Sequence, residues 1–204
     1  MSTRNLTLII ILGVILVLGG CVGCGTISFQ KKAVQLDEGV KGAWGKVQSQ
    51  YQRRSDLIPN LVSVVKGAAN FEQETLTKVI EARAKATAVN INAGDLTPDK
   101  LAQFQQAQGQ LGGALNKLLV VAEAYPTLKA NQNFLDLQAQ LEGTENRITV
   151  ARNDFNTAVQ SYNSTIRQFP NNIYSGWFGY KDQPYFKSDP GSDQAPKIDP
   201  NAFK

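Results

Sequence analysis

The chain has 204 residues, a formal net charge of +4 and no histidine. Because histidine is the commonest general base and the commonest metal ligand, a histidine-based catalytic or metal centre is excluded. Lysine and arginine are scattered and mostly lie near acidic residues, so no basic stripe forms and nucleic-acid binding is not expected. The length gives room for one domain with additional segments.

The N-terminal segment LTLIIILGVILVLGGCVGCG, residues 6–25, carries no charged residue. A run of about 20 apolar residues has the length of a helix that spans a hydrocarbon core. Arg4 precedes the run, and Lys31 and Lys32 follow it, which slightly favours a cytoplasmic N-terminus and a domain outside the cytoplasm. We therefore predict that residues 1–26 form a membrane anchor, in the first place an uncut transmembrane helix.

The same segment can also be interpreted as a bacterial lipoprotein signal. The motif LGGC, residues 18–21, places small residues before a thiol, so cleavage there would make Cys21 an acylated N-terminus. The length of the apolar run favours the spanning helix over this alternative. Cys21 and Cys24 form a Cys-x-x-Cys pair, but zinc takes four ligands and the chain has no further cysteine or histidine.

After the anchor, apolar residues recur at steps of three and four, which is the pattern of a helix with one buried face. This first seam crosses Pro59, and a proline inside a helix removes one hydrogen bond and costs roughly 3 kcal/mol. The helix therefore either kinks at Pro59 or a new helix begins there, with Ser55 or Asp56 as its cap. Residues 89–97 are rich in turn formers and end the segment. The seam consists of Val40, Trp44, Val47, Tyr51, Ile58, Leu61, Val65, Ala68, Leu76, Val79, Ile80 and Arg83.

Two further seams follow with the same spacing. The second is expected to start with Thr97 as N-cap and Pro98 as first helical residue. Gln108 is its polar member, and Thr144 is the only clearly polar member of the third. The second seam consists of Leu101, Phe104, Gln108, Leu111, Leu115, Leu118, Ala122 and Tyr125. The third, in a helix predicted over residues 126–169, consists of Phe134, Leu137, Leu141, Thr144, Ile148, Ala151, Phe155, Ala158, Tyr162, Ile166 and Phe169.

Three long amphipathic segments joined by short turns predict an all-α, antiparallel bundle, because each seam must be buried against the others. The bundle has four helices if the first segment divides near Pro59. We assign residues 1–26 to the anchor, 27–187 to the bundle with an aromatic C-terminal cap, and 188–204 to a disordered tail rich in proline and serine.

Six aromatic residues lie between Tyr174 and Phe186, interrupted by glycine and proline residues that argue against a helix. We expect this segment to pack over the end of the bundle. The alternative is an exposed patch that meets lipid headgroups or a partner protein. Its candidate residues are Trp177, Phe178, Tyr180, Tyr185 and Phe186.

In the motif YQRRSDLIPNLV, residues 51–62, Arg53 and Asp56 are close enough for a surface ion pair worth about 0.2–0.5 kcal/mol. Arg54 lies close to the first seam, so we expect a buried stem and a head that reaches Glu81 or Glu145. This favours a structural role in tying helices together. The alternative is that Arg53 and Arg54 contact a partner or an anion, since arginine binds carboxylates bidentately.

The motif YQRRSDLIPNLV and the ending FPNNIYSGWFGYKDQPYF occur in the order found in the LemA family of bacterial membrane proteins, and the chain resembles that family over about residues 27–187. The resemblance implies a four-helix, up-and-down bundle on a single membrane anchor. It also implies roles in the cell envelope, in some relatives near membrane proteases, and similarity to a magnetosome protein.

No spacing of serine, lysine or carboxylate sets a nucleophile beside a base, so we predict that the chain is not an enzyme and needs no cofactor. The first hypothesis is a membrane-tethered scaffold or adaptor that binds other envelope proteins, membrane proteases among them. The second is a structural protein that forms homo-oligomers and organises or shapes the membrane. A hydrolase that uses a serine and a lysine is the remote third.

Overall fold

A computed structural model describes residues 3–68 and 71–187, without the side chains of residues 3–10, 18, 21 and 22. This part of the chain is helical and contains no strand, which confirms the all-α prediction. Its elements are α1 (Thr3–Lys66), α2 (Gln73–Ala88), the short 3-10 helix η1 (Ala93–Asp95), α3 (Pro98–Ala122), α4 (Pro126–Lys129), α5 (Gln132–Arg167) and α6 (Asn171–Phe178). The tail predicted to be disordered, residues 188–204, lies outside the described residues.

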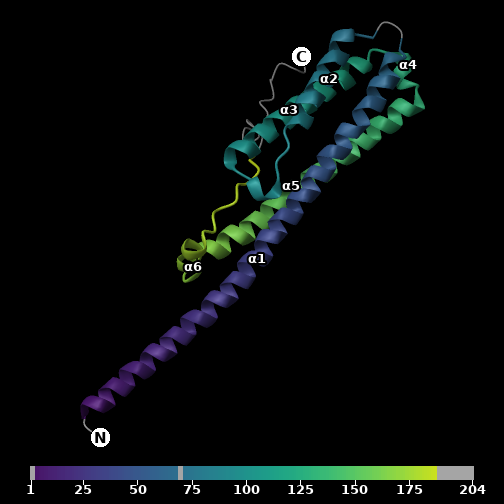
Figure 1. The fold of residues 1–204 in the computed structure, drawn as a ribbon. Helices are drawn as coiled ribbons and strands as arrows, with labels where there is room; N and C mark the ends of the chain where they lie inside the picture. The colour runs from purple at the N-terminus through teal and green to yellow at the C-terminus, as the bar shows by residue number, and fades with distance from the viewer. Residues whose placement is uncertain (1–2, 69–70, 188–204) are drawn as a thin grey trace, which may run out of the picture.

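The four long helices run alternately up and down, as Figure 1 shows. Helix α1 has 64 residues and is therefore about 96 Å long at 1.5 Å per residue. It packs most extensively against α5, while α2 packs against α3. The N-terminal part of α1 extends well beyond the bundle (Figure 1).

The first segment divides between Lys66 and Gln73, so of the alternatives left open at Pro59 a new helix beginning there is not found. Helix α1 continues through Pro59, although a proline offers no N–H to the carbonyl four residues before it. That carbonyl belongs to Ser55, and Arg83 of α2 donates to it from Nε at 2.9 Å. A side chain from the neighbouring helix thus satisfies the acceptor that the proline leaves open.

The seams predict most of the buried residues, but two of their members, Ile80 and Phe169, are exposed, and four are only half-buried: Ala68, Arg83, Tyr125 and Ala158. Ile80 is 45% exposed, and Ala82 and Ala86 are buried in its place, because α2 is a new helix with its own phase. Phe169 is 80% exposed because α5 ends at Arg167. In α5, Val159 rather than Ala158 is fully buried, as the straight helix drifts relative to a strict heptad.

The ends of α3 and α5 are capped by side chains. The Oγ1 of Thr97 accepts from the backbone N–H of Lys100 at 3.3 Å, and Pro98 begins α3, as predicted. The helix predicted over residues 126–169 is interrupted, since α4 ends at Lys129. Asn131 then caps α5 by accepting from two backbone N–H groups.

The buried apolar residues form two separate cores. The core near α6 is built around Trp44 and Phe155, and the core at the opposite end around Leu61 and Leu118. Trp44 donates from Nε1 to the carbonyl of Ile91 at 3.0 Å, which ties the loop after α2 to α1. The division into two cores matters because polar residues lie between them.

The segment after α6 is held to α5 by two asparagines. Asn156 exchanges two hydrogen bonds with the backbone of Phe186, and Asn163 does the same with Gln183. The two asparagines are seven residues apart, about 10.5 Å along a helix. Their partners are three residues apart, about 10 Å in extended chain. The matching spacings let one straight helix face hold an extended segment.

Within the described part of the chain, no helix combines the length and the apolar character required to cross a bilayer. The membrane anchor over residues 1–26 therefore stays a prediction.

Candidate functional site

Buried polar residues of α1, α3 and α5 lie in one layer between the two apolar cores. Arg54 and Ser55 of α1, Gln108 of α3 and Thr144 of α5 are all buried there. The sequence marks Gln108 and Thr144 as exceptions within their own seams. The structure places these exceptions at the same level of the bundle, where they meet the YQRRSDLIPNLV motif.

Arg54 is the centre of this layer and is only 4% exposed. Its Nη1 donates to Glu145 Oε2 at 3.0 Å, and its Nη2 donates to the side-chain and backbone oxygens of Gln108 at 2.6 and 3.1 Å. Its guanidinium carbon also lies 5.0 Å from the ring centroid of Tyr51. Arg54 thus joins α1, α3 and α5, and of the two predicted partners Glu145 is the one found.

The ion pair of Arg54 is asymmetric. The side chain of Glu145 is 58% exposed, while that of Arg54 is 5% exposed. Water can solvate the carboxylate, but the guanidinium depends on Glu145 and Gln108 for its compensation, and its Nε has no partner. An uncompensated buried charge is strongly destabilising, so the exposed Glu145 has more influence on stability than its position suggests.

A polar crevice opens above Arg54 between α3 and α5, with a volume of about 230 Å³. Three glycines, which have no side chain, form part of its α3 wall. A Cβ on Gly112 would lie 3.9 Å from Arg54 Nη1. The crevice is lined by Tyr51, Arg54, Gln105, Gln108, Gly109, Gly112, Gly113, Asn116, Glu145 and Arg152. These glycines therefore widen the entrance to the polar layer, rather than bringing α3 closer to its neighbour.

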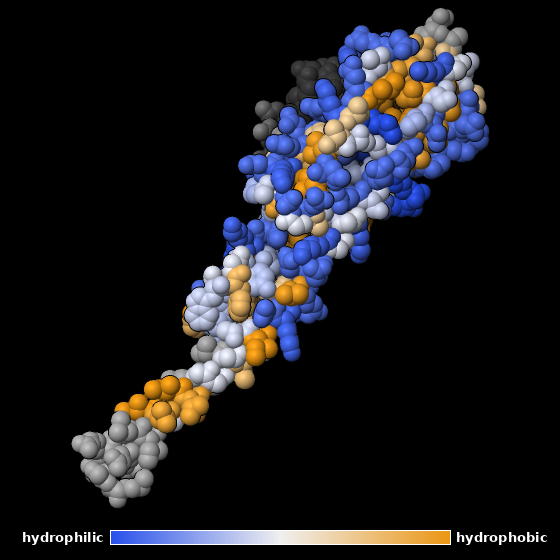
Figure 2. All heavy atoms as spheres, in the orientation of Figure 1, coloured by the Kyte–Doolittle hydropathy of each residue, from blue (hydrophilic) through white to orange (hydrophobic). Residues whose placement is uncertain are grey.

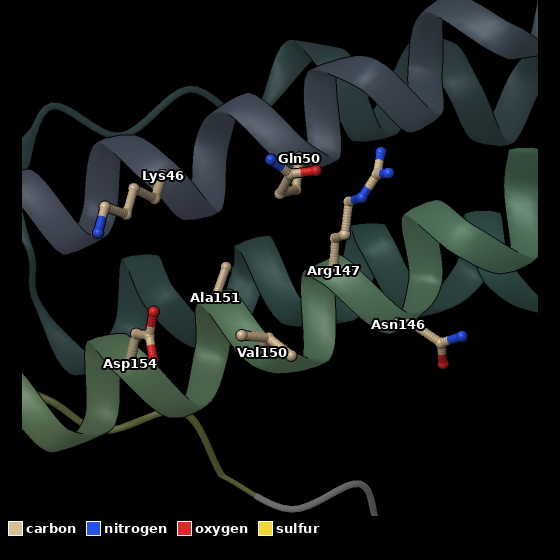
Figure 3. Close-up of a pocket in the computed structure, with 7 residues that line it drawn as sticks. All are labelled: Lys46, Gln50, Asn146, Arg147, Val150, Ala151 and Asp154. Carbon is tan, nitrogen blue, oxygen red and sulfur yellow. The ribbon is translucent and has the colours of Figure 1, made fainter.

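A second, more apolar groove of about 340 Å³ runs along the outer face of the α1–α5 pair (Figure 3). Val150 and Ala151 lie on its α5 side, and Val150 is 59% exposed. Its lining residues are Lys46, Gln50, Asn146, Arg147, Val150, Ala151 and Asp154. The Oε1 of Gln50 is buried beside this groove and has no hydrogen-bond partner, so the groove combines an apolar strip with an unsatisfied acceptor below its surface.

Arg53 differs from its neighbour because its side chain is exposed. In the described structure it forms no ion pair with Asp56, whose Oδ1 accepts instead from Gln52 at 2.7 Å. The surface pair expected from the spacing is therefore absent, and Arg53 is a free surface cation. A contact of Arg53 or Arg54 with a partner or an anion stays a prediction.

The aromatic residues near the C-terminus separate into buried and exposed groups. Phe186 is buried, 6.0 Å from the ring of Trp44 and 5.3 Å from that of Phe155, so it belongs to the core rather than to a surface patch. Tyr180 is half-buried against Phe29. Trp177, Phe178 and Tyr185 are exposed. The segment also forms α6, contrary to the prediction that its glycines exclude a helix.

Two polar residues of α5, Asn156 and Asn163, were missed by the sequence reasoning. Asn163 is 2% exposed and lies next to Tyr162, a member of the third seam. The pair could have been noticed as two polar residues seven positions apart on the same helix. The link from Arg83 to Ser55 could have been found from Pro59, since a proline identifies the carbonyl it leaves open.

Burial raises the pKa of Tyr162 to about 12, with smaller contributions from nearby Asp37, Tyr180 and Asp182.

The proposed lipid attachment at Cys21 falls on a side chain outside the described residues. Cys24 is exposed. Among the residues that the structure describes, no group of histidine, cysteine or carboxylate side chains could hold a metal ion.

The fold and the polar layer define a class of protein: a bundle of long helices in which a buried arginine joins three of the helices. A family model described as the LemA family matches residues 43–199. The chain belongs to the LemA family. The resemblance noted in the sequence is thus confirmed.

Several curated proteins are similar to the chain. The magnetosome protein MamQ 2 of Paramagnetospirillum magneticum is 26% identical over 190 residues, which cover 84% of this chain and 69% of the relative. MamQ of Magnetospirillum gryphiswaldense is 26% identical over 172 residues, covering 75% and 62%. Protein LemA of Metamycoplasma hominis is 29% identical over 130 residues, covering 64% and 56%. These comparisons suggest a membrane-associated protein, and none of the names is that of an enzyme family.

Proposed function

We propose that this protein is a non-enzymatic helical scaffold, held at a membrane of the bacterial envelope, whose bundle binds other envelope proteins. One observation carries the membrane part of the proposal. Described apolar side chains between Ile11 and Val17 are 52% to 70% exposed, on a part of α1 that extends beyond the bundle (Figure 2). Apolar surface of this kind marks a membrane or protein interface, because leaving it in water is costly.

The continuity of α1 supports a tether rather than a flexible link. The same helix that carries the exposed apolar residues continues through both cores to Lys66. A membrane that holds the N-terminal segment therefore holds the bundle at a defined distance, with its grooves displayed along the rod. An uncut spanning helix with the bundle outside the cytoplasm is the first form of the anchor, and acylation at Cys21 is its alternative.

The α1–α5 groove is the proposed surface for protein partners. An amphipathic helix lying in such a groove would cover Val150 with its apolar face. The groove also favours a second candidate, self-association. Lys46, Arg147 and Asp154 give it both signs of charge, so two copies related by a two-fold axis could be complementary.

Cross-linking in cells, followed by purification of the tagged full-length protein from membranes and mass spectrometry, tests these proposals. Cross-links to other envelope proteins that a Val150→Lys change removes support the scaffold. Ladders of this chain alone, lost in the same variant, support self-association. Recovery of the protein in the soluble fraction would refute the membrane tether. The intact mass separates the two anchors, because a chain that starts at acylated Cys21 has lost its first residues and gained lipid.

A further inference from the structure

Helix α6 is apolar on two faces, although only one of them packs against the bundle. On the inner face, the rings of Tyr174 and Phe178 lie 5.8 and 6.5 Å from that of Phe29. On the outer face, Ile173 and Trp177 are one helical turn apart and are 44% and 65% exposed. We use the name α6 patch for Ile173 and Trp177 together with the exposed part of Phe178, which also contacts Phe29 and is 45% exposed. A helix on an ordinary water-facing surface would carry polar residues at these positions.

The position of the α6 patch along α1 is well defined. The hydroxyl of Tyr174 lies 2.9 Å from where a Cβ on Gly25 would be, and Phe29 contacts Tyr174 and Phe178. Helix α6 therefore meets α1 between residues 25 and 29, a distance of about 6 Å along the axis. Figure 1 shows α6 at the end of the bundle nearest to the N-terminal part of α1.

This level corresponds to the edge of the proposed membrane anchor. The uncharged run ends at Gly25. The headgroup layer on each side of a bilayer extends about 5–7 Å beyond the hydrocarbon core. The contact between α6 and α1 thus lies within the headgroup layer if residues 6–25 occupy the core. The alternative anchor gives the same level, because Cys21 lies only four residues before Gly25.

The charges at this end of the molecule also suit a lipid surface. Lys31, Lys32 and Lys181 are exposed there. In the sequence, no acidic residue precedes Asp37. Asp182, four residues after the end of α6, is paired with Arg167. Cations on flexible stems with neighbouring tryptophan and tyrosine are the composition found at membrane–water interfaces.

We propose that the α6 patch lies in the headgroup layer of the membrane that holds the N-terminal segment. The partner of this surface is lipid, and Trp177 is the side chain that enters the layer most fully. The contact fixes the bundle at the membrane in addition to the anchor, because it adds a second point of attachment beside α1. This inference rests on the membrane tether of the proposed function, so its test must separate the two.

The two tryptophans of the chain provide the probe. Trp44 is fully buried, whereas Trp177 is 65% exposed, so the difference between the wild-type protein and Trp177→Phe isolates the emission of Trp177. The full-length protein is reconstituted in phosphatidylcholine–phosphatidylglycerol vesicles. Quenching is measured with aqueous iodide and with lipids brominated at shallow or deep acyl positions. Flotation of the vesicles reports separately whether the chain is membrane-bound.

The expected result is a several-fold weaker iodide quenching of Trp177 in vesicles than in detergent-free unfolded protein, together with stronger quenching by shallow than by deep bromines. If the protein floats with the vesicles but Trp177 stays open to iodide and insensitive to brominated lipid, the inference is wrong and the tether stands. Protection from iodide without any lipid quenching means that protein covers the patch, which also overturns the inference. A chain that does not float refutes the tether itself, and the inference with it.

Discussion

The link between Arg83 and Ser55 predicts an energetic coupling between Arg83 and Pro59. Pro59 leaves the carbonyl of Ser55 without its helical donor, and the Nε of Arg83 lies 2.9 Å from that oxygen. Replacing Pro59 by alanine restores the N–H that an uninterrupted helix would supply. In that background Arg83 should no longer be needed at this position.

The magnitude follows from the type of hydrogen bond. A bond with a charged donor contributes about 1.5–3 kcal/mol, and an unsatisfied buried carbonyl costs about 1–3 kcal/mol. Since Arg83 is half-buried, we expect Arg83→Met to lower the free energy of unfolding by about 1.5–2.5 kcal/mol in the wild-type background. Methionine retains an apolar stem, so most of the loss reports the hydrogen bond rather than packing. After Pro59→Ala, the same change should cost less than about 1 kcal/mol.

A double-mutant cycle measures this coupling through urea unfolding of the full-length protein in mild detergent, followed by circular dichroism at 222 nm. Lys85→Met is the matched control, because Lys85 is an exposed cation on the same helix and its removal should change stability by no more than about 0.5 kcal/mol. Additive effects of Pro59→Ala and Arg83→Met, within about 0.5 kcal/mol, would refute the explanation given for the continuity of α1.

Three further predictions concern the polar layer and the C-terminal segment. Glu145→Gln should cost about 1.5–3 kcal/mol although Glu145 is exposed, because it leaves the charge of Arg54 uncompensated, whereas Glu142→Gln on the neighbouring turn should be nearly neutral in the same unfolding assay. Asn163→Ala should cost about 1–3 kcal/mol and expose the segment around Gln183 to protease and hydrogen exchange; an unchanged exchange pattern there would contradict the role of the asparagines. For Tyr162, a folded-state pKa of about 12 against 10.0 in the unfolded chain means that its contribution is present below pH 10 and is lost between about pH 10 and 12. In absorbance titration at 295 nm, Tyr162→Phe should remove the highest step, and a titration identical to that of the wild type would show that Tyr162 ionises normally.

The periodicity of the sequence predicts which helix faces are buried, because side chains on one face recur with the period of the helix and every apolar side chain left in water costs free energy. This explains why the seams through Trp44, Leu111 and Phe155 are correct. The same reasoning fails at Ile80, because the break between α1 and α2 resets the phase of the helix. It also fails at Phe186, whose burial depends on Asn156 and Asn163, far from it in the sequence.

The polar layer could be predicted only in part for a related reason. Gln108 and Thr144 stand out because each interrupts an apolar seam, and Arg54 because it is a charged residue close to one. The sequence gives their positions along three separate helices, but not the level at which the helices are aligned. Glu81 and Glu145 were therefore equivalent as partners of Arg54, and only the packing of α5 against α1 distinguishes them.

The polar layer itself determines the level at which the helices are aligned. Apolar contacts repeated every three or four residues are nearly as favourable after α5 slides along α1 by one heptad, about 10.5 Å, so the seams alone define the axial alignment poorly. Such a slide would remove Glu145 from Arg54 and leave the buried guanidinium without its carboxylate partner. The two asparagines that hold Gln183 and Phe186 require the same alignment, because they place the C-terminal segment over Trp44. Alignment is in turn what brings α6 to residues 25–29 of α1, so the polar layer, far from both segments in the sequence, determines where the exposed aromatic residues lie relative to the N-terminal segment.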